Sequence, residues 1–357
     1  MYKERLQRVL SKMKENNLKQ VLVLDPESIW YLTGYQNEPM ERFYALYLRD
    51  DENHIMFLNK LFPAPDTDLQ CLWFSDTDDY IGLLASKVDG DETLGVDKEM
   101  RARFLVPLMK LCPDCDIVLA SDCVDDVRAC KDDGEREYIG KLSSIDDKVM
   151  QAAEGFIKEG VTEAEVAQMI LDEYKKYGHD SDIILPSVAF GPNAADPHHK
   201  TDSTVIKEGD CVLIDTGSKK KLYASDMTRT FFYKKAGDKQ REVYETVRQA
   251  NEIAEKMVKP GVKLCDLDKA ARDHITNAGY GEYFTHRLGH FIGLNVHEKG
   301  DVSSASEIIA QPGMIFSIEP GVYIPDEFGV RIEDIVLVTE DGCKILNSYT
   351  KELKVLG

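Results

Sequence analysis

Four carboxylates of this chain lie where a charged side chain is costly. Each stands inside or at the end of an apolar, strand-like run; they are Asp215, Asp226, Glu319 and Glu333. A charged group in a buried strand must be paired or bound to a metal, because burial without compensation is strongly unfavourable. These positions therefore predict strands that end at a cation-binding site.

Histidines gather close to these carboxylates. Residues 285–298, T-H-R-L-G-H-F-I-G-L-N-V-H-E, hold three of the eight histidines, His286, His290 and His297. Two more, His198 and His199, stand together upstream. Such clustering of a sparse residue favours a functional site over histidines that are merely tolerated beside Gly-rich turns. One imidazole with four carboxylates is a ligand set that suits a pair of divalent first-row cations.

The spacing of the two aspartates predicts a hairpin. Ten residues separate Asp215 from Asp226, so an even-numbered loop centred on residues 220–221 would place them directly opposite one another. Opposed side chains have Cβ atoms about 5 Å apart, and two cations about 3.5–4 Å apart would bind both carboxylates. Further along, Arg331 and Glu333 share one face of a strand because strand side chains alternate.

The spacing of the histidines requires a break in a strand. His290 and His297 are seven residues apart, which sends them to opposite faces of an unbroken strand. A bulge or bend at Gly293 would bring both to one site. His286 would share a face with His290 only on a helix, and the local pattern leaves both arrangements open. In a metal site we expect His286 to stand behind the ligands rather than among them.

Length, charge and cysteine content narrow the class of protein. A chain of 357 residues is long enough for about two domains. The formal net charge of −20 argues against nucleic acid and membrane partners. The first ten residues carry mixed charge and no long apolar segment, so a cytoplasmic protein is expected. The eight cysteines are expected to be reduced thiols, with a zinc ribbon at Cys112, Cys115, Cys123 and Cys130 as the alternative.

Two domains are predicted. Residues 1–125 alternate strand-like and helix-like patterns, as in an α/β domain, and the runs 45–48 and 54–58 around a polar loop predict a hairpin. The acidic segment 125–137 is the predicted boundary, and the second domain spans residues 132–357.

Three helices are predicted early in the second domain. Thr162 begins a capping box, and Gly237 precedes a long helix with a regular apolar stripe. Asp266 is expected to cap a third helix that ends at Gly279.

The motifs that surround the carboxylates resemble those of the pita-bread metallopeptidases, the family of methionine aminopeptidase, aminopeptidase P and prolidase. They read D-T-G-x8-D-M-T-R-T, G-H, H-E, S-I-E-P-G-V-Y and R-I-E-D. The resemblance covers residues 132–357, and the preceding domain is similar to that of the prolidase and aminopeptidase P branch. It implies an α/β two-domain chain in which a creatinase/prolidase-like domain precedes a pita-bread α+β catalytic domain.

The resemblance also implies a set of site residues. Two divalent ions, with manganese favoured and zinc or cobalt as alternatives, would be held by Asp215, Asp226, His290, Glu319 and Glu333. The four carboxylates balance the charge of two such ions and leave a metal-bridging hydroxide as the nucleophile, with Glu319 as the base. His297 would donate to the developing oxyanion, and Arg331 would hold Glu333. His198, in the loop G-P-N-A-A-D-P-H-H, would face the substrate.

Two departures from the family pattern bear on specificity. Phe291 follows the metal-binding histidine where many members have glycine, and residues 299–301 replace a proline and an arginine that helps to bind substrate. The cation for a substrate carboxylate must therefore come from elsewhere. Lys299 and Arg42, the latter reaching across a homodimer, are predicted to bind substrate together with His198 and His286, and Arg287 is a further candidate.

The expected reaction is hydrolysis of the peptide bond that precedes proline. An Xaa-Pro dipeptidase is favoured over an aminopeptidase P that acts on longer peptides, and a homodimer is expected. A metal-free creatinase-like enzyme or a non-catalytic binding protein of the same fold is the remaining alternative. The presence of all five ligands argues against it.

Overall fold

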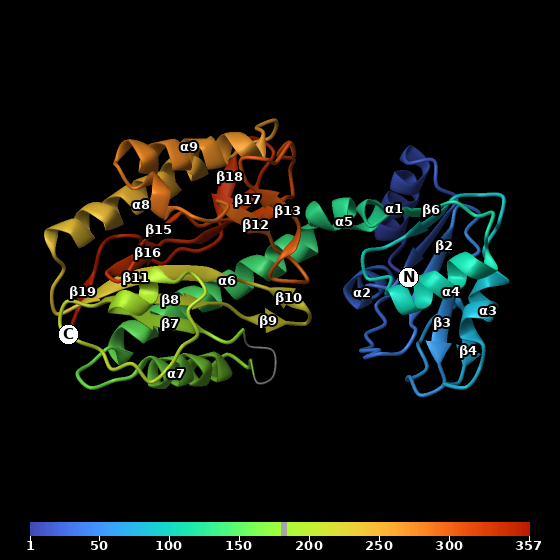
Figure 1. Ribbon diagram of the computed structural model, residues 1–357, viewed down its shortest axis with the longest axis horizontal. Coiled ribbons are helices and arrows are strands. Elements are labelled where there is room, and N and C mark those ends of the chain that lie inside the picture. The colour runs from blue at the N-terminus through green and yellow to red at the C-terminus, as the bar shows by residue number, and fades with distance from the viewer. Residues whose placement is uncertain (180–183) are drawn as a thin grey trace. The chain divides into compact units, whose positions relative to one another are not determined.

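The computed structural model describes residues 1–179 and 184–357, which divide into two compact units, Met1–Arg128 and Ala129–Gly357. The division falls inside the acidic segment 125–137. In each unit, helices cover a β-sheet (Figure 1). We describe the amino-terminal and carboxy-terminal units separately.

The amino-terminal unit is built on a mixed six-stranded sheet with the strand order β4-β3-β2-β1-β5-β6. The predicted hairpin is confirmed, since β2 and β3 run antiparallel with Tyr47 opposite Ile55. The strands are β1 (Gln20–Val23), β2 (Ala45–Arg49), β3 (Ile55–Asn59), β4 (Gln70–Phe74), β5 (Leu94–Val96) and β6 (Ile117–Leu119). The helices are α1 (Lys3–Glu15), α2 (Pro26–Thr33), α3 (Tyr80–Ala85), α4 (Ala102–Leu111) and α5 (Asp122–Ala129).

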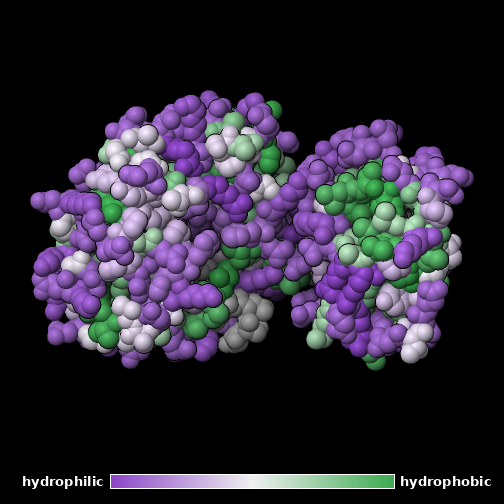
Figure 2. Space-filling model, viewed as in Figure 1, coloured by the Kyte–Doolittle hydropathy of each residue, from purple (hydrophilic) through white to green (hydrophobic). Residues whose placement is uncertain are grey.

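Most of the surface shown in Figure 2 is hydrophilic, in keeping with the net charge of −20. A hydrophobic patch interrupts this surface on the amino-terminal unit. Exposed apolar side chains of the unit include Val106, Met109 and Leu111 of α4 and Leu119 of β6. No helix within the described residues is long and apolar enough to cross a membrane.

Four long helices flank the strands of the carboxy-terminal unit. They are α6 (Asp133–Ala153), α7 (Glu163–Lys176), α8 (Asp238–Met257) and α9 (Leu264–Asn277). The capping box at Thr162 is confirmed at the start of α7. The predicted cap of α9 is wrong, because Lys263 is the N-cap and Asp266 lies within the first turn. The backbone N–H of Leu264 donates to the carbonyl of Ile308 at 2.9 Å, so a neighbouring loop satisfies one of the N–H groups at the helix start that lack an intrahelical partner.

The strands lie between two pairs of helices, α8 with α9 on one side and α6 with α7 on the other (Figure 1). The larger sheets have the orders β19-β11-β8-β7 and β13-β12-β14-β17-β18, and β15-β16 and β10-β9 form two-stranded sheets. The strands are β7 (Ser187–Phe190), β8 (Cys211–Thr216), β9 (Lys219–Lys220), β10 (Tyr223–Ala224), β11 (Met227–Tyr233), β12 (Gly289–Phe291), β13 (Glu298–Val302), β14 (Ile315–Ile318), β15 (Gly321–Ile324), β16 (Phe328–Arg331), β17 (Asp334–Val338), β18 (Cys343–Ile345) and β19 (Val355–Leu356).

The hairpin that carries the two aspartates is present, but its register differs from the prediction. Asp215 lies opposite Thr228 rather than Asp226. The chain reverses at Lys221 and Leu222, both of which have positive φ values of 47° and 72°, so the turn is centred one residue later than expected. Two residues of positive φ form the type of tight turn that fits the twist of paired strands. The two aspartates are therefore diagonal neighbours on one face.

Candidate metal centre

Strand ends from several parts of the carboxy-terminal unit meet at one pocket of about 670 Å³. Its described lining includes the five predicted metal ligands, Asp215, Asp226, His290, Glu319 and Glu333, and also His198, His286, Arg287, His297 and Arg331. Asp215 lies in β8 and His290 in β12, while the other three ligands directly precede or follow a strand. The predicted ligands therefore lie together although more than one hundred residues of chain separate the first from the last.

His290 turns one ring nitrogen toward the carboxylates. Its Nδ1 lies 3.2 Å from the carbonyl oxygen of Phe291, so this nitrogen carries the proton and Nε2 keeps a free lone pair. Nε2 is 3.3 Å from Glu319 Oε1, 3.8 Å from Asp226 Oδ2 and 4.0 Å from Glu333 Oε1. A lone pair that faces three carboxylate oxygens is suited to a shared cation.

Neighbouring hydroxyl groups orient the carboxylates. Thr228 Oγ1 donates to Glu333 Oε2 at 2.7 Å, and Ser317 Oγ donates to Glu319 Oε1 at 3.0 Å. The other oxygen of Glu333, Oε1, is buried and has no hydrogen-bond partner among the described groups. A buried carboxylate oxygen without a donor is costly, and this oxygen faces the space between the ligands.

Burial opposes ionisation of these acids in the absence of a cation. Burial and the neighbouring carboxylates raise the pKa of Asp226 and Glu333 well above the usual range. Burial likewise raises the pKa of Glu319 and lowers the pKa of His290 to about 4, so the imidazole is neutral near pH 7. The pocket therefore gathers four acids around a neutral ligand.

Arg331 compensates part of this charge. Its Nη2 donates to Asp215 Oδ2 at 2.6 Å and its Nε to Thr228 Oγ1 at 3.1 Å. Arg331 reaches Glu333 through Thr228, whose hydroxyl accepts from Arg331 and donates to Glu333. Arg331 is 4% exposed, so its guanidinium interacts with groups inside the site and not with solvent.

Tyr323 links Arg331 to His286. The Tyr323 hydroxyl accepts from Arg331 Nη1 at 2.9 Å and lies 2.9 Å from His286 Nε2. His286 Nδ1 lies 2.7 Å from the carbonyl of Arg287, so it carries the ring proton and Nε2 accepts from the tyrosine. Burial raises the pKa of Tyr323 to about 12, which keeps the hydroxyl protonated. His286 thus lines the pocket but stands behind the ligands, in the position expected for it.

The structure brings His297 against His290, with ring centroids 4.1 Å apart. Strand β12 ends at Phe291, and the chain bends over residues 293–297 before β13 begins at Glu298. The register shifts between His290 and Phe291, which pair with Asp301 and Glu298 respectively, so the extra residues are Lys299 and Gly300 in β13. Gly300 takes a φ of 109°, a value that glycine adopts readily. The expected bend at Gly293 is present, and the bulge in β13 is a second irregularity beside it.

The remaining predicted substrate contacts divide into those that reach the pocket and those that do not. His198 is exposed and lines it. Lys299 is exposed and is not among the described lining residues. It belongs to the bulge in β13, and the adjacent Glu298 turns inward, where its carboxylate lies 3.0 Å from Lys131 Nζ. Arg42 lies in the amino-terminal unit, where its guanidinium binds Asp76 with Nε 3.0 Å from Oδ1. The described pocket lining thus does not include Lys299.

Arg287 is the cation that the pocket holds in place of Lys299. Among the described lining residues, the cationic side chains besides histidine are Arg287 and Arg331. The closest acid that Arg287 meets is Asp301, at 3.9 Å, and the Arg287 side chain is 39% exposed. A loosely paired guanidinium is thus available to an anion that enters the pocket.

Three positioning residues were missed in the sequence, although two of them follow a simple pattern. Ser317 and Thr228 each lie two residues from an acid, Glu319 and Asp226, so strand alternation places their hydroxyl groups on the face of the acid. Tyr323 lies in β15, across the Pro320–Gly321 break, and its link to Arg331 depends on the pairing of β15 with β16.

A buried set of carboxylates and histidine of this composition, open to a pocket, is suited to metal-dependent hydrolysis. Residues 137–340 match the model of metallopeptidase family M24, and residues 5–130 match the creatinase/prolidase N-terminal domain. The chain therefore belongs to metallopeptidase family M24 and is a peptidase.

The relatives extend over the whole chain. It is 34% identical to a Bacillus subtilis protein named "Putative dipeptidase YkvY", over 99% of each chain. A prolidase structure from Thermococcus sibiricus is similar with a TM-score of 0.93 and 31% identity, covering 100% of this chain and 99% of that one. The dipeptidase PepE of Mycobacterium ulcerans is similar with a TM-score of 0.94 and 33% identity, covering 99% and 98%. These likenesses confirm the predicted fold class.

Proposed function

We propose that this protein is an Xaa-Pro dipeptidase that works with two divalent metal ions, manganese by preference. The ligand set Asp215, Asp226, His290, Glu319 and Glu333 is the observation that carries the metal-dependent part of the proposal. The similarity to a prolidase and a dipeptidase supports the choice of substrate.

The residues present fit a metal centre. Ligand atoms of Asp226, His290 and Glu333 lie within 4.8 Å of one another, and Glu333 Oε1 has no other partner among the described groups. Four carboxylates and one imidazole suit manganese, zinc or cobalt. Two divalent ions would balance the four negative charges and thereby remove the electrostatic cost of ionising the acids.

Two such ions supply Lewis-acid polarisation of a carbonyl and activation of a water molecule. Glu319 is placed to take up and return a proton, because its carboxyl is oriented by Ser317 and its side chain is 16% exposed, at the edge of the buried set. Burial lowers the pKa of His297 to about 4, so its neutral imidazole donates a hydrogen bond to the carbonyl oxygen as charge develops there. His198, on the pocket wall, orients the peptide.

Recognition of a dipeptide requires a cation for its free carboxylate, and we assign this role to Arg287. Arg331 is already bound to Asp215 and Tyr323, whereas Arg287 meets Asp301 only at 3.9 Å. A guanidinium binds a carboxylate through two parallel hydrogen bonds. Arg287 is partly exposed, so the pocket is open to solvent beside it and also admits longer peptides. Aminopeptidase P activity is therefore the second candidate.

Hydrolysis of matched peptides by the manganese-loaded protein tests the proposal. An Xaa-Pro dipeptide should give a higher kcat/KM than the tripeptide Xaa-Pro-Xaa, and a dipeptide with alanine in place of proline should be a poor substrate. Equal rates on the dipeptide and the tripeptide would support aminopeptidase P instead. Equal rates on the proline and alanine dipeptides would remove proline from the specificity.

We also propose that the protein is a homodimer. The exposed apolar side chains of α4 support this, because large apolar patches on soluble proteins often mark interfaces. Sedimentation that shows an active monomer at the assay concentration would contradict it.

A further inference from the structure

A buried amide lies directly behind two of the proposed ligands. Asn251 of α8 is completely buried, and its Nδ2 donates to the carbonyl of Ile318 at 2.8 Å and to that of Ile332 at 3.4 Å. These carbonyls belong to the residues that immediately precede Glu319 and Glu333. One side chain thus bridges the backbone at both glutamates.

Lys351 fixes the orientation of this amide. Its Nζ donates to Asn251 Oδ1 at 2.8 Å, so the amide oxygen faces the ammonium and the amide nitrogen faces the two carbonyls. The same ammonium lies 2.6 Å from Glu255 Oε2 and 2.8 Å from Asp334 Oδ2. Asp334 directly follows Glu333, so Lys351 also contacts the side chain next to that ligand.

Arg229 completes the buried network. Its Nη1 donates to the carbonyl of Glu333 at 2.6 Å, and its Nη2 to Asp334 Oδ1 at 2.6 Å. Arg229 and Asp334 are each 1% exposed. The charges of Arg229 and Asp334 are removed from water at considerable cost, and burial of such charges is weak evidence for a role in stability.

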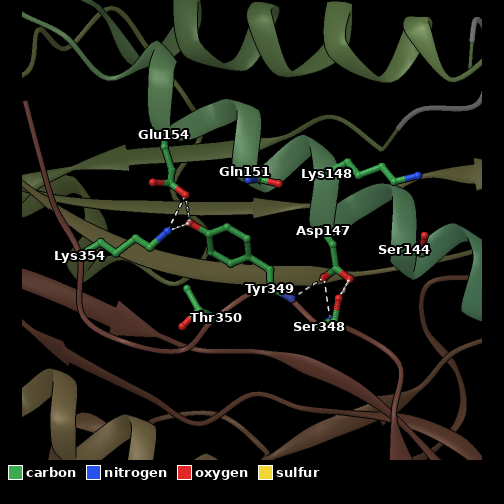
Figure 3. A pocket seen from close by; sticks show the side chains of 9 residues that line it. All are labelled: Ser144, Asp147, Lys148, Gln151, Glu154, Ser348, Tyr349, Thr350 and Lys354. Carbon is green, nitrogen blue, oxygen red and sulfur yellow. Dashed lines mark hydrogen bonds and ion pairs between the residues drawn. The ribbon is translucent and has the colours of Figure 1, made fainter.

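The segment that carries Lys351 is itself anchored on α6 (Figure 3). Asp147 accepts from the backbone N–H groups of Ser348 and Tyr349 at 2.8 Å each. At the other end of the pocket shown, Glu154 accepts from the Tyr349 hydroxyl at 2.6 Å and from Lys354 Nζ at 2.6 Å. Lys351 therefore approaches Asn251 from a segment that is fixed on both sides.

We propose that Asn251, oriented by Lys351, is a positioning residue that sets the placement of Glu319 and Glu333 for metal binding. The inference rests on the proposed metal centre. Groups that orient metal ligands contribute to affinity although they do not touch the metal, and their loss weakens metal binding by about 10–100-fold. Asn251 acts on the backbone of two ligands at once, so its effect should appear in metal affinity beyond any effect on folding.

The isosteric change Asn251→Asp separates these two effects. It keeps the acceptor for Lys351 but replaces the donor by an oxygen that repels the carbonyls of Ile318 and Ile332. The dissociation constant for Mn²⁺ is measured by calorimetry on chelator-treated, refilled protein at 25 °C, with folding checked by circular dichroism. We expect binding about 10–100-fold weaker than in the wild type.

Asn59→Asp is the matched control. Asn59 is also buried, at 1% exposure, and bonded to a side chain and to the backbone, but it lies in the amino-terminal unit. This variant should bind Mn²⁺ as the wild type does. A dissociation constant for Asn251→Asp within twofold of the wild type, or an equal loss in both variants, would overturn the inference.

Lys351→Met decides the question if Asn251→Asp does not fold. It leaves Asn251 in place but frees its amide to rotate, and we expect Mn²⁺ binding to weaken at least fivefold; unchanged binding would overturn the inference. A wild-type protein that binds no Mn²⁺ would refute the proposed function itself, so the two failures are distinguishable.

Discussion

Replacement of Arg287 by alanine should selectively weaken the hydrolysis of dipeptides that carry a free carboxylate. A hydrogen bond to a charged group contributes about 1.5–3 kcal/mol. The Arg287 side chain is 39% exposed, and solvent screening reduces the contribution to about 1–2 kcal/mol. Because about 1.4 kcal/mol corresponds to a factor of ten, kcat/KM for Xaa-Pro should fall by about 5–30-fold.

The assay compares an Xaa-Pro dipeptide with its carboxamide in the wild type and in Arg287→Ala. The carboxamide lacks the negative charge, so its kcat/KM should change little, and the preference for the acid should largely disappear. Lys299→Ala tests the competing assignment and should leave the preference intact, because Lys299 lies outside the described pocket lining. Equal losses on both substrates in Arg287→Ala, or loss of the preference in Lys299→Ala, would refute this reasoning.

Two further predictions concern the ligands and the buried network. His290→Ala and Glu333→Gln should abolish both metal binding and hydrolysis. His297→Ala should retain the metal and lower kcat by on the order of 10²-fold. If metal analysis finds no metal in His297→Ala, this histidine belongs among the ligands. Burial raises the pKa of Glu255 to about 8, so between about pH 4.5 and 8 the folded protein keeps a proton that the unfolded chain loses. The free energy of unfolding should therefore fall with rising pH, by at most about 1.4 kcal/mol per unit. Urea unfolding should show a shallower pH dependence for Glu255→Gln, and equal slopes would contradict the assignment.

The ligand set was accessible from the sequence because acids in apolar strands are costly and therefore informative. The position of His286 was not decided by its spacing from His290; in the structure its ring accepts from Tyr323. The predicted register of the hairpin that carries Asp215 and Asp226 is wrong. The turn has positive φ values at Lys221 and Leu222, and neither lysine nor leucine indicates such a conformation in a sequence.

Other features depend on contacts between segments far apart in the chain. The bulge at Lys299 and Gly300 arises from the pairing of β12 with β13. The position of Asn251 on α8 indicates its role only once the helix is seen in the structure. It continues the inward stripe of α8 from Val247, where a polar residue is buried only if it has partners.

Metal titration of the chelator-treated wild-type chain tests the central claim most directly. Calorimetry with Mn²⁺ should show two sites per chain, and hydrolysis of an Xaa-Pro dipeptide should recover as these sites fill. A chain that remains folded, binds no Mn²⁺, Zn²⁺ or Co²⁺ and still hydrolyses the dipeptide would contradict the account.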